Sequence, residues 1–141
     1  MTETFYSQWR SAGTIPCLRD VGPGPPPERL LQALWQRQRL QRQALRTLDG
    51  RSLRVLHPGF WNHEAGPDFR DAVIQIANEA PISGAVEVDT VGADWRAHGH
   101  ATNPAFTEVI LHVIWNGRTD TALPTLLLEP YLDAPWAELV E

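Results

Sequence analysis

Two short stretches of the chain contain most of the side chains that could do chemistry. They are HPGFWNHEAGPDF at residues 57–69 and EVDTVGADWRAHGH at residues 87–100. The Pro-Gly and Gly-Pro pairs of the first stretch interrupt helices and strands, so it should form a shaped loop that positions polar side chains. The polar loop residues that could support a site are His57, Asn62, His63, Glu64 and Asp68.

Three carboxylates are expected to meet at one end of a sheet. Glu87 and Asp89 are two positions apart on a predicted strand, so their side chains point to the same face. Asp68 begins the preceding strand, and antiparallel pairing of the two strands would bring it close to both. Like charges so near one another favour a bound cation, and oxygen ligands suit Mg²⁺ or Mn²⁺. The alternative is that Asp68 caps a turn and that Glu87 and Asp89 are the polar half of an alternating strand.

The histidines allow a second kind of metal site. His98 and His100 could bind a transition metal, but no third ligand follows at a defined spacing. A weaker option is a metal hydrolase whose ligands are His57, His63, His98 and His100. His112 lies between Leu111 and Val113, which favours a hydrogen-bonded histidine in the core. P-loop, dinucleotide-binding and G-x-S-x-G motifs are absent.

The spacing of apolar residues predicts the elements that must position these side chains. A helix is expected over residues 28–40, because a proline precedes Glu28 and an apolar stripe includes Leu34 and Trp35. A hairpin is expected around Asp49-Gly50, a preferred pair for a tight turn, with arms at 45–48 and 52–56. The strands expected in one sheet are 52–57, 71–77, 83–90 and 108–115, with PTLLLEP at 124–130 as a further edge strand.

The size and composition are those of one globular domain. The chain has 141 residues, of which 43% are hydrophobic and 21% are charged. We expect residues 1–27 to form an arm that ends in the stiff linker VGPGPPP, and residues 28–141 to form a single α/β domain. No secretory signal and no membrane-spanning run is evident, and Cys17 is the only cysteine. These features predict a cytoplasmic protein that does not bind membranes.

The distribution of charge is uneven. A net charge of −5 disfavours non-specific binding to nucleic acid, which depends on a basic surface. Seven arginines nevertheless fall between residues 29 and 54. Such a run is either a solvated face or a local patch that faces phosphate.

The series HPGFWNHEAGPDF, GAVEVD, DWRAHGH and VILHVIW resembles a bacterial family of uncharacterised proteins, domain-of-unknown-function family 2851. The resemblance covers about residues 28 to 116. Typical members are longer, so the resemblance implies a short member or a fragment. It implies no established activity.

Pro67-Asp68 and Glu87-Val88-Asp89, in which Asp68 and Glu87 are 19 positions apart, also resemble the PD-(D/E)xK signature of restriction-endonuclease-like nucleases. This likeness implies a mixed sheet core with a flanking N-terminal helix. It further implies a phosphodiesterase that acts on nucleic acid, with Mg²⁺ or Mn²⁺ held by Asp68 and Glu87. Asp89 stands where the signature has lysine. It would then be a third ligand, with His98, His100 or an arginine in the role of the lysine. The alternative is a non-catalytic binding or assembly module that keeps the fold.

Overall fold

The computed structural model describes residues 26–90, 104–119 and 121–139. The expected N-terminal arm lies outside the described residues up to residue 25. Most of the predicted connector that contains His98 and His100 also lies outside them. The described elements are α3 (Glu28–Gln36), β1 (Leu53–His57), β2 (Phe60–Trp61), β3 (Phe69–Ile76), β4 (Ile82–Asp89), η1 (Pro104–Phe106), β5 (Val109–Ile114), β6 (Thr125–Leu127), η2 (Glu129–Tyr131) and α5 (Trp136–Leu139).

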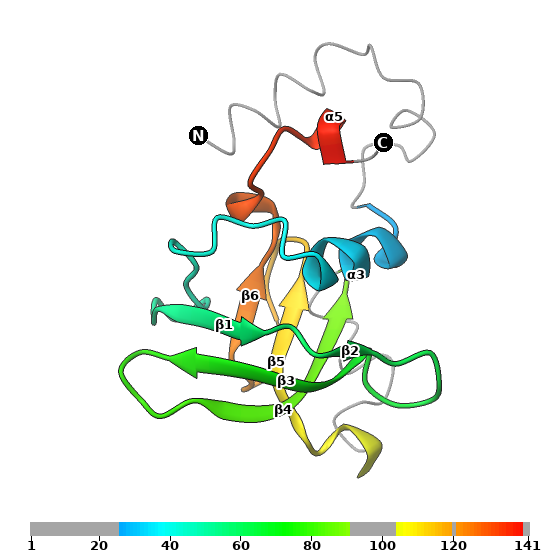
Figure 1. Ribbon diagram of the computed structural model, residues 1–141, viewed down its shortest axis with the longest axis vertical. Helices are drawn as coiled ribbons and strands as arrows, with labels where there is room; N and C mark the ends of the chain where they lie inside the picture. The colour runs from blue at the N-terminus through cyan, green and yellow to red at the C-terminus, as the bar shows by residue number, and fades with distance from the viewer. Residues whose placement is uncertain (1–25, 91–103, 120, 140–141) are drawn as a thin grey trace.

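The strands form one mixed sheet in the order β1-β3-β4-β5-β6, and β2 pairs with β3. The pairs β1–β3 and β3–β4 are antiparallel, whereas β4–β5 and β5–β6 are parallel. The sheet is curled, and α3 packs on it near the carboxyl ends of β4 and β5 (Figure 1). The four predicted strands in one sheet are therefore confirmed, and so is the expected edge strand, which is β6.

The apolar stripe of α3 packs into the main core of the protein. Leu31 and Trp35 are fully buried there, in one cluster with Val86 and Val88 of β4. The indole Nε1 of Trp35 donates a hydrogen bond to the carbonyl of Pro58, 2.9 Å away. Burial of an apolar side chain such as Leu31 contributes about 1.5–3 kcal/mol to the free energy of unfolding. The predicted packing of the helix across the sheet is confirmed.

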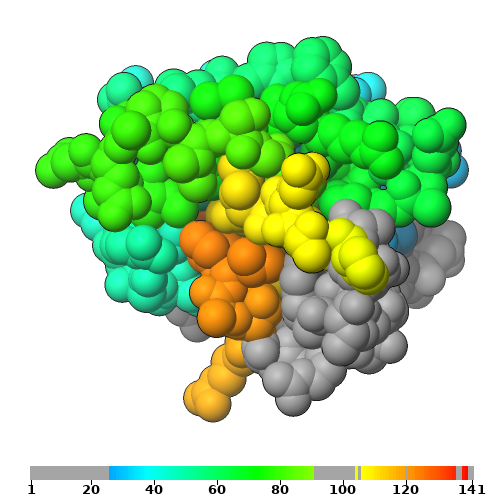
Figure 2. Space-filling view, turned by 90° about the horizontal axis from the view of Figure 1, so that it is seen from below, coloured from blue at the N-terminus to red at the C-terminus, as the bar shows by residue number. Residues whose placement is uncertain are grey.

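A second, smaller cluster covers the beginning of the β4–β5 pair. Phe106 and Leu123 pack against the buried residues Ala85 and Val109. In Figure 2 the yellow segment around η1 lies between the green β3–β4 region and the orange segment that leads to β6.

The helix is shorter than predicted. It ends at Gln36 rather than near residue 40, because Gln38 adopts a left-handed conformation with φ of 51°. The Arg39 N–H then donates to the Leu34 carbonyl, and the Gln38 N–H donates to the Trp35 carbonyl. This pair of bonds is the Schellman ending, which usually has glycine at the left-handed position. With glutamine there, the sequence contains no glycine to indicate the end.

The predicted first arm of the hairpin, residues 45–48, is not a strand. The Gly50 N–H donates to the Thr47 carbonyl at 2.8 Å, so the turn is centred on Leu48 and Asp49 rather than on the expected pair Asp49-Gly50. Gly50 follows it with φ of 88°, and only the single bridge between Arg46 and Ser52 flanks the turn. The Leu48 N–H instead donates to the carbonyl of Thr125 in β6, at 2.8 Å. The segment before one edge strand thus reaches the other edge strand, and this contact is part of the curl of the sheet.

Candidate functional site

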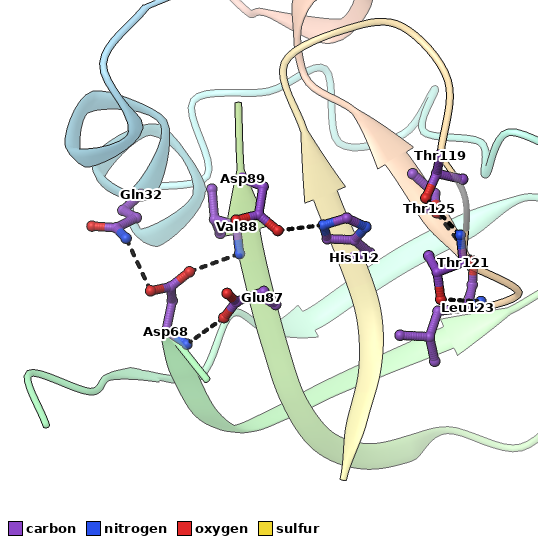
Figure 3. A network of polar contacts seen from close by, with 10 residues as sticks. All are labelled: Gln32, Asp68, Glu87, Val88, Asp89, His112, Thr119, Thr121, Leu123 and Thr125. Carbon is purple, nitrogen blue, oxygen red and sulfur yellow. Dashed lines mark hydrogen bonds and ion pairs between the residues drawn. The ribbon is translucent and has the colours of Figure 1, made fainter. Parts of the chain in front are cut away.

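Asp68 and Glu87 come together where β3 begins and β4 ends. The first residue of β3, Phe69, pairs with Val86 of β4. Because the two strands are antiparallel, Val88 extends past the start of β3 and has no residue of β3 opposite it. Asp68 fills that position: its carboxylate Oδ2 accepts the Val88 N–H at 2.8 Å. Its own N–H donates to Oε1 of Glu87 at 3.1 Å (Figure 3). Antiparallel pairing therefore joins two carboxylates that are 19 positions apart in the chain.

Gln32 of α3 was missed by the sequence reasoning. Its Nε2 donates to Oδ1 of Asp68 at 3.0 Å, so both carboxylate oxygens of Asp68 accept a hydrogen bond (Figure 3). The available signal was its place beside Leu31, at the flank of the apolar stripe that faces the sheet. Gln32 fixes the orientation of the aspartate that immediately precedes β3.

Asp68, Glu87 and Asp89 form an acidic cluster, which holds more negative charge than its surroundings can solvate. Glu87 is only 4% exposed, and burial raises its pKa to about 10, with the carboxylates of Asp68 and Asp89 acting in the same direction. Burial also raises the pKa of Asp68, although the bond from Val88 opposes this shift. Glu87 is consequently protonated at neutral pH and hydrogen-bonds to the side chain of Asp68. A cation would take the place of that proton.

Asp89 has a different environment from the other two carboxylates. Its Oδ2 lies 2.7 Å from Nε2 of His112, and both side chains are completely buried. Parallel pairing of β4 with β5 places Glu87 opposite His112, which brings the ring within reach of Asp89 (Figure 3). His112 is therefore a hydrogen-bonded core histidine, as its apolar neighbours predict. Asp89, the third expected ligand, lies beside Glu87 in β4, but its carboxylate is hydrogen-bonded to His112 in the core.

A pocket of about 380 Å³ opens next to Asp68. Arg29 and Gln32 of α3 line one side of it, and Trp61 and His63 line another. The Trp61 ring stacks on the buried Phe69 and on the exposed His63, with ring centres 5.8 and 5.4 Å away. The other lining residues are Glu28, Asn62, Glu64 and Asp68. The pocket gives a small ligand access to Asp68 beside one arginine.

The loop of residues 57–69 is held by its own polar groups. The Asn62 side chain donates to the Pro67 carbonyl at 2.9 Å and accepts from the Glu64 N–H at 3.1 Å. Its backbone N–H donates to the carbonyl of Asp68 at 2.7 Å. At the start of the loop, Nδ1 of His57 accepts the Gly59 N–H at 2.9 Å. Asn62 thus ties the loop to the residue that enters the acidic cluster.

The donor chemistry of the cluster fits a hard cation with few protein ligands. Within residues 26–90, 104–119 and 121–139, no three His, Cys, Asp or Glu side chains form a group that could hold a metal ion. Asp68 and Glu87 do provide two adjacent carboxylates. Mg²⁺ commonly binds through one or two carboxylates together with waters and substrate phosphates. His98 and His100 lie outside the described residues.

In the part of the chain that the structure describes, no helix is long and apolar enough to cross a membrane.

Comparison with curated proteins and with solved structures finds no match. The model of one protein family, described as a protein of unknown function (DUF2851), matches residues 28–140. That match includes α3, every strand of the sheet and the acidic cluster. The chain belongs to the DUF2851 family.

Proposed function

We propose that the protein is a metal-dependent phosphodiesterase of the restriction-endonuclease-like kind and that it acts on nucleic acid. Asp68 and Glu87 are the ligands of Mg²⁺ or Mn²⁺ in this proposal, and Asp89 adds negative charge beside them. The observation that carries it is the bond from the Asp68 N–H to Glu87 Oε1, which unites the two carboxylates at the end of β4.

The order of the elements supports the proposal. The helix α3 precedes the antiparallel series β1, β3 and β4, and β5 then runs parallel to β4. The PD-(D/E)xK likeness implies this same order, with its aspartate at the start of one strand of the central hairpin and its glutamate on the next. Asp68 and Glu87 occupy these places.

A bound Mg²⁺ or Mn²⁺ would supply a water of lowered pKa and charge stabilisation for the phosphate. Gln32 and the Val88 N–H hold the carboxylate of Asp68 in one orientation. Arg29 provides a positive group in the pocket beside Asp68, where it would face a substrate phosphate in place of the missing lysine. His98 or His100 would assist proton transfer.

Cleavage of a supercoiled plasmid and of an RNA tests the proposal. We expect both Mg²⁺ and Mn²⁺ to support cleavage of one of these substrates, and a chelator to stop it. Glu87→Gln should reduce the rate by more than the roughly 10–100-fold that loss of an outer-shell partner costs. Glu79→Gln makes the same change at an exposed turn and should leave the rate unchanged.

Two further variants and one outcome sharpen that test. His98→Ala and His100→Ala should lower the rate without lowering the melting temperature if these histidines transfer protons. Undiminished cleavage by Glu87→Gln would mean that the activity comes from another site or from a contaminant.

A non-catalytic binding or assembly module is the second candidate. It is favoured by the hydrogen bonds that already engage both oxygens of Asp68 and by the buried pair of Asp89 with His112. In such a module the acidic cluster would only fix the ends of β3 and β4. Absence of both cation binding and cleavage in the full chain would support it.

A further inference from the structure

Four of the seven arginines between residues 29 and 54 fall into two groups. Arg39 pairs with Asp133, with 3.2 Å between Nε and Oδ1, and Arg51 pairs with Asp49 at 2.9 Å. These arginines belong to surface ion pairs. Arg42 and Arg54 differ, because both line a single cavity against the edge strand β1.

The cavity is large, about 880 Å³, and its lining combines apolar residues with polar and basic ones. Among the described residues that line it there is no aspartate or glutamate. Besides the two arginines, the polar lining residues are Gln43, Ser52, Gln75 and Asn78. A concave surface with two guanidinium groups and no acid, in a chain with a net charge of −5, is suited to an anionic ligand.

Arg42 is held in place at this surface. Its Nη2 donates to the carbonyl of Val55 in β1 at 2.7 Å, which covers part of the open edge of the sheet. A guanidinium has five N–H donors, so this bond orients the group while other donors can still meet an oxyanion. Arg54 lies on β1 opposite Gln75 of β3 and is exposed. The two arginines therefore come from different segments but face the same cavity.

We infer that this cavity, defined by Arg42 and Arg54, binds the phosphodiester backbone of nucleic acid. The inference rests on the proposed function only for the choice of polyanion; the charge and shape of the cavity are independent of the acidic cluster. Phosphate contacts of this kind hold and orient nucleic acid without reading its sequence.

The position of the cavity bounds the length of nucleic acid that suffices to reach both the cavity and Asp68. Gln75 lies seven residues after Asp68, and at about 3.3 Å per residue the two are at most ~23 Å apart along β3. That span corresponds to about seven base pairs of a duplex at 3.4 Å each. A duplex of at least this length is therefore long enough to contact both sites at once.

The inference is tested by fluorescence anisotropy with the full chain in a chelator, so that binding is measured without cleavage. The probes are a labelled DNA duplex and a labelled single-stranded RNA, both longer than the span above. Arg54→Ala should weaken binding of at least one probe about five- to tenfold at ~0.1 M salt and should lower the salt slope by about 1. Arg51→Ala removes the same charge outside the cavity and should change the affinity less than about twofold.

Arg54→Glu should weaken binding more than Arg54→Ala, and a melting curve for each variant verifies that the domain is folded. Equal effects of Arg54→Ala and Arg51→Ala would overturn the inference, and so would displacement of the probe by poly-glutamate as effective as that by unlabelled nucleic acid. Loss of binding in Arg54→Ala without any cleavage by the wild type would support the cavity and contradict the proposed phosphodiesterase. Wild-type cleavage together with unchanged binding in Arg54→Ala would support the phosphodiesterase and contradict the role of the cavity.

Discussion

Glu87 links the stability of the fold to pH, because it is buried between two other carboxylates. Its pKa of about 10 in the folded chain lies above the ordinary value of 4.5, so the folded state binds a proton more tightly than the unfolded state. The stabilisation is fully present below about pH 4.5 and is lost as the pH rises toward 10. The expected slope is at most about 1.4 kcal/mol per pH unit.

Glu87→Gln separates this effect from the rest of the protein. Glutamine keeps an acceptor for the Asp68 N–H and a donor for its carboxylate, but it cannot ionise. In metal-free buffer we expect the variant to be more stable than the wild type at pH about 9 and to vary less between pH about 6 and 9. Urea unfolding at the two pH values measures this difference, and equal slopes for the two proteins would contradict it.

For the individual residues, the sequence predicted that Asp68 and Glu87 lie close together, but it did not predict the groups that surround them. The proximity follows from side-chain alternation and antiparallel pairing, both of which are local rules. The bond between Asp89 and His112 depends on the parallel register of β4 and β5, which side-chain alternation alone does not determine. Gln32 reaches Asp68 only because α3 crosses the sheet at that point.

The loop between β1 and β3 positions Asp68, and Gly59 has less room for a side chain than the other glycine of that loop, Gly66. Gly59 has φ of 93°, and a Cβ there would lie 2.8 Å from the carbonyl oxygen of Arg70. Gly50 has a similar φ of 88°, but a Cβ there meets nothing within 4 Å. The two glycines therefore separate backbone strain from steric overlap.

We expect Gly50→Ala to cost about 1–2 kcal/mol of unfolding free energy, from strain alone. Gly59→Ala should cost a further ~1–3 kcal/mol, because β3 must move away from the added methyl group. Chemical denaturation of both variants gives the comparison. If the two substitutions cost the same, the close packing of the loop against β3 is wrong.

The elements themselves were predictable where their signal is local. Strands β3, β4 and β5 are formed by apolar runs that glycine or proline bounds. The predicted ends of each strand lie within two residues of the observed ends. Strand β2 was missed because two residues are too few for a period, and Phe60 and Trp61 pair with β3 inside a segment read as a loop. The end of α3 was missed because Gln38 takes the place of the usual glycine.

The shape of the whole molecule was the least predictable feature. The curl of the sheet includes the bond between Leu48 and Thr125, and the bridge between Leu40 and Leu132 ties the segment after α3 to the segment after β6. These contacts join residues far apart in the chain, and no pattern along the sequence encodes them. The charge distribution was no more predictable: Arg39 and Arg51 form ion pairs, whereas the neighbouring Arg42 and Arg54 line the cavity at β1.

The central claim is that the cluster of Asp68 and Glu87 binds a divalent cation in exchange for a proton. Calorimetric titration of Mn²⁺ and Mg²⁺ into the full chain, at two pH values and in buffers of different ionisation enthalpy, measures both the affinity and the protons released. We predict one cation site in the wild type and in Glu79→Gln. Each unit of rise in pH should tighten cation binding by up to about tenfold, and each cation bound should release about one proton. Glu87→Gln should lose this binding while remaining folded. Binding that is absent from the wild type, or unchanged in Glu87→Gln, would contradict the account.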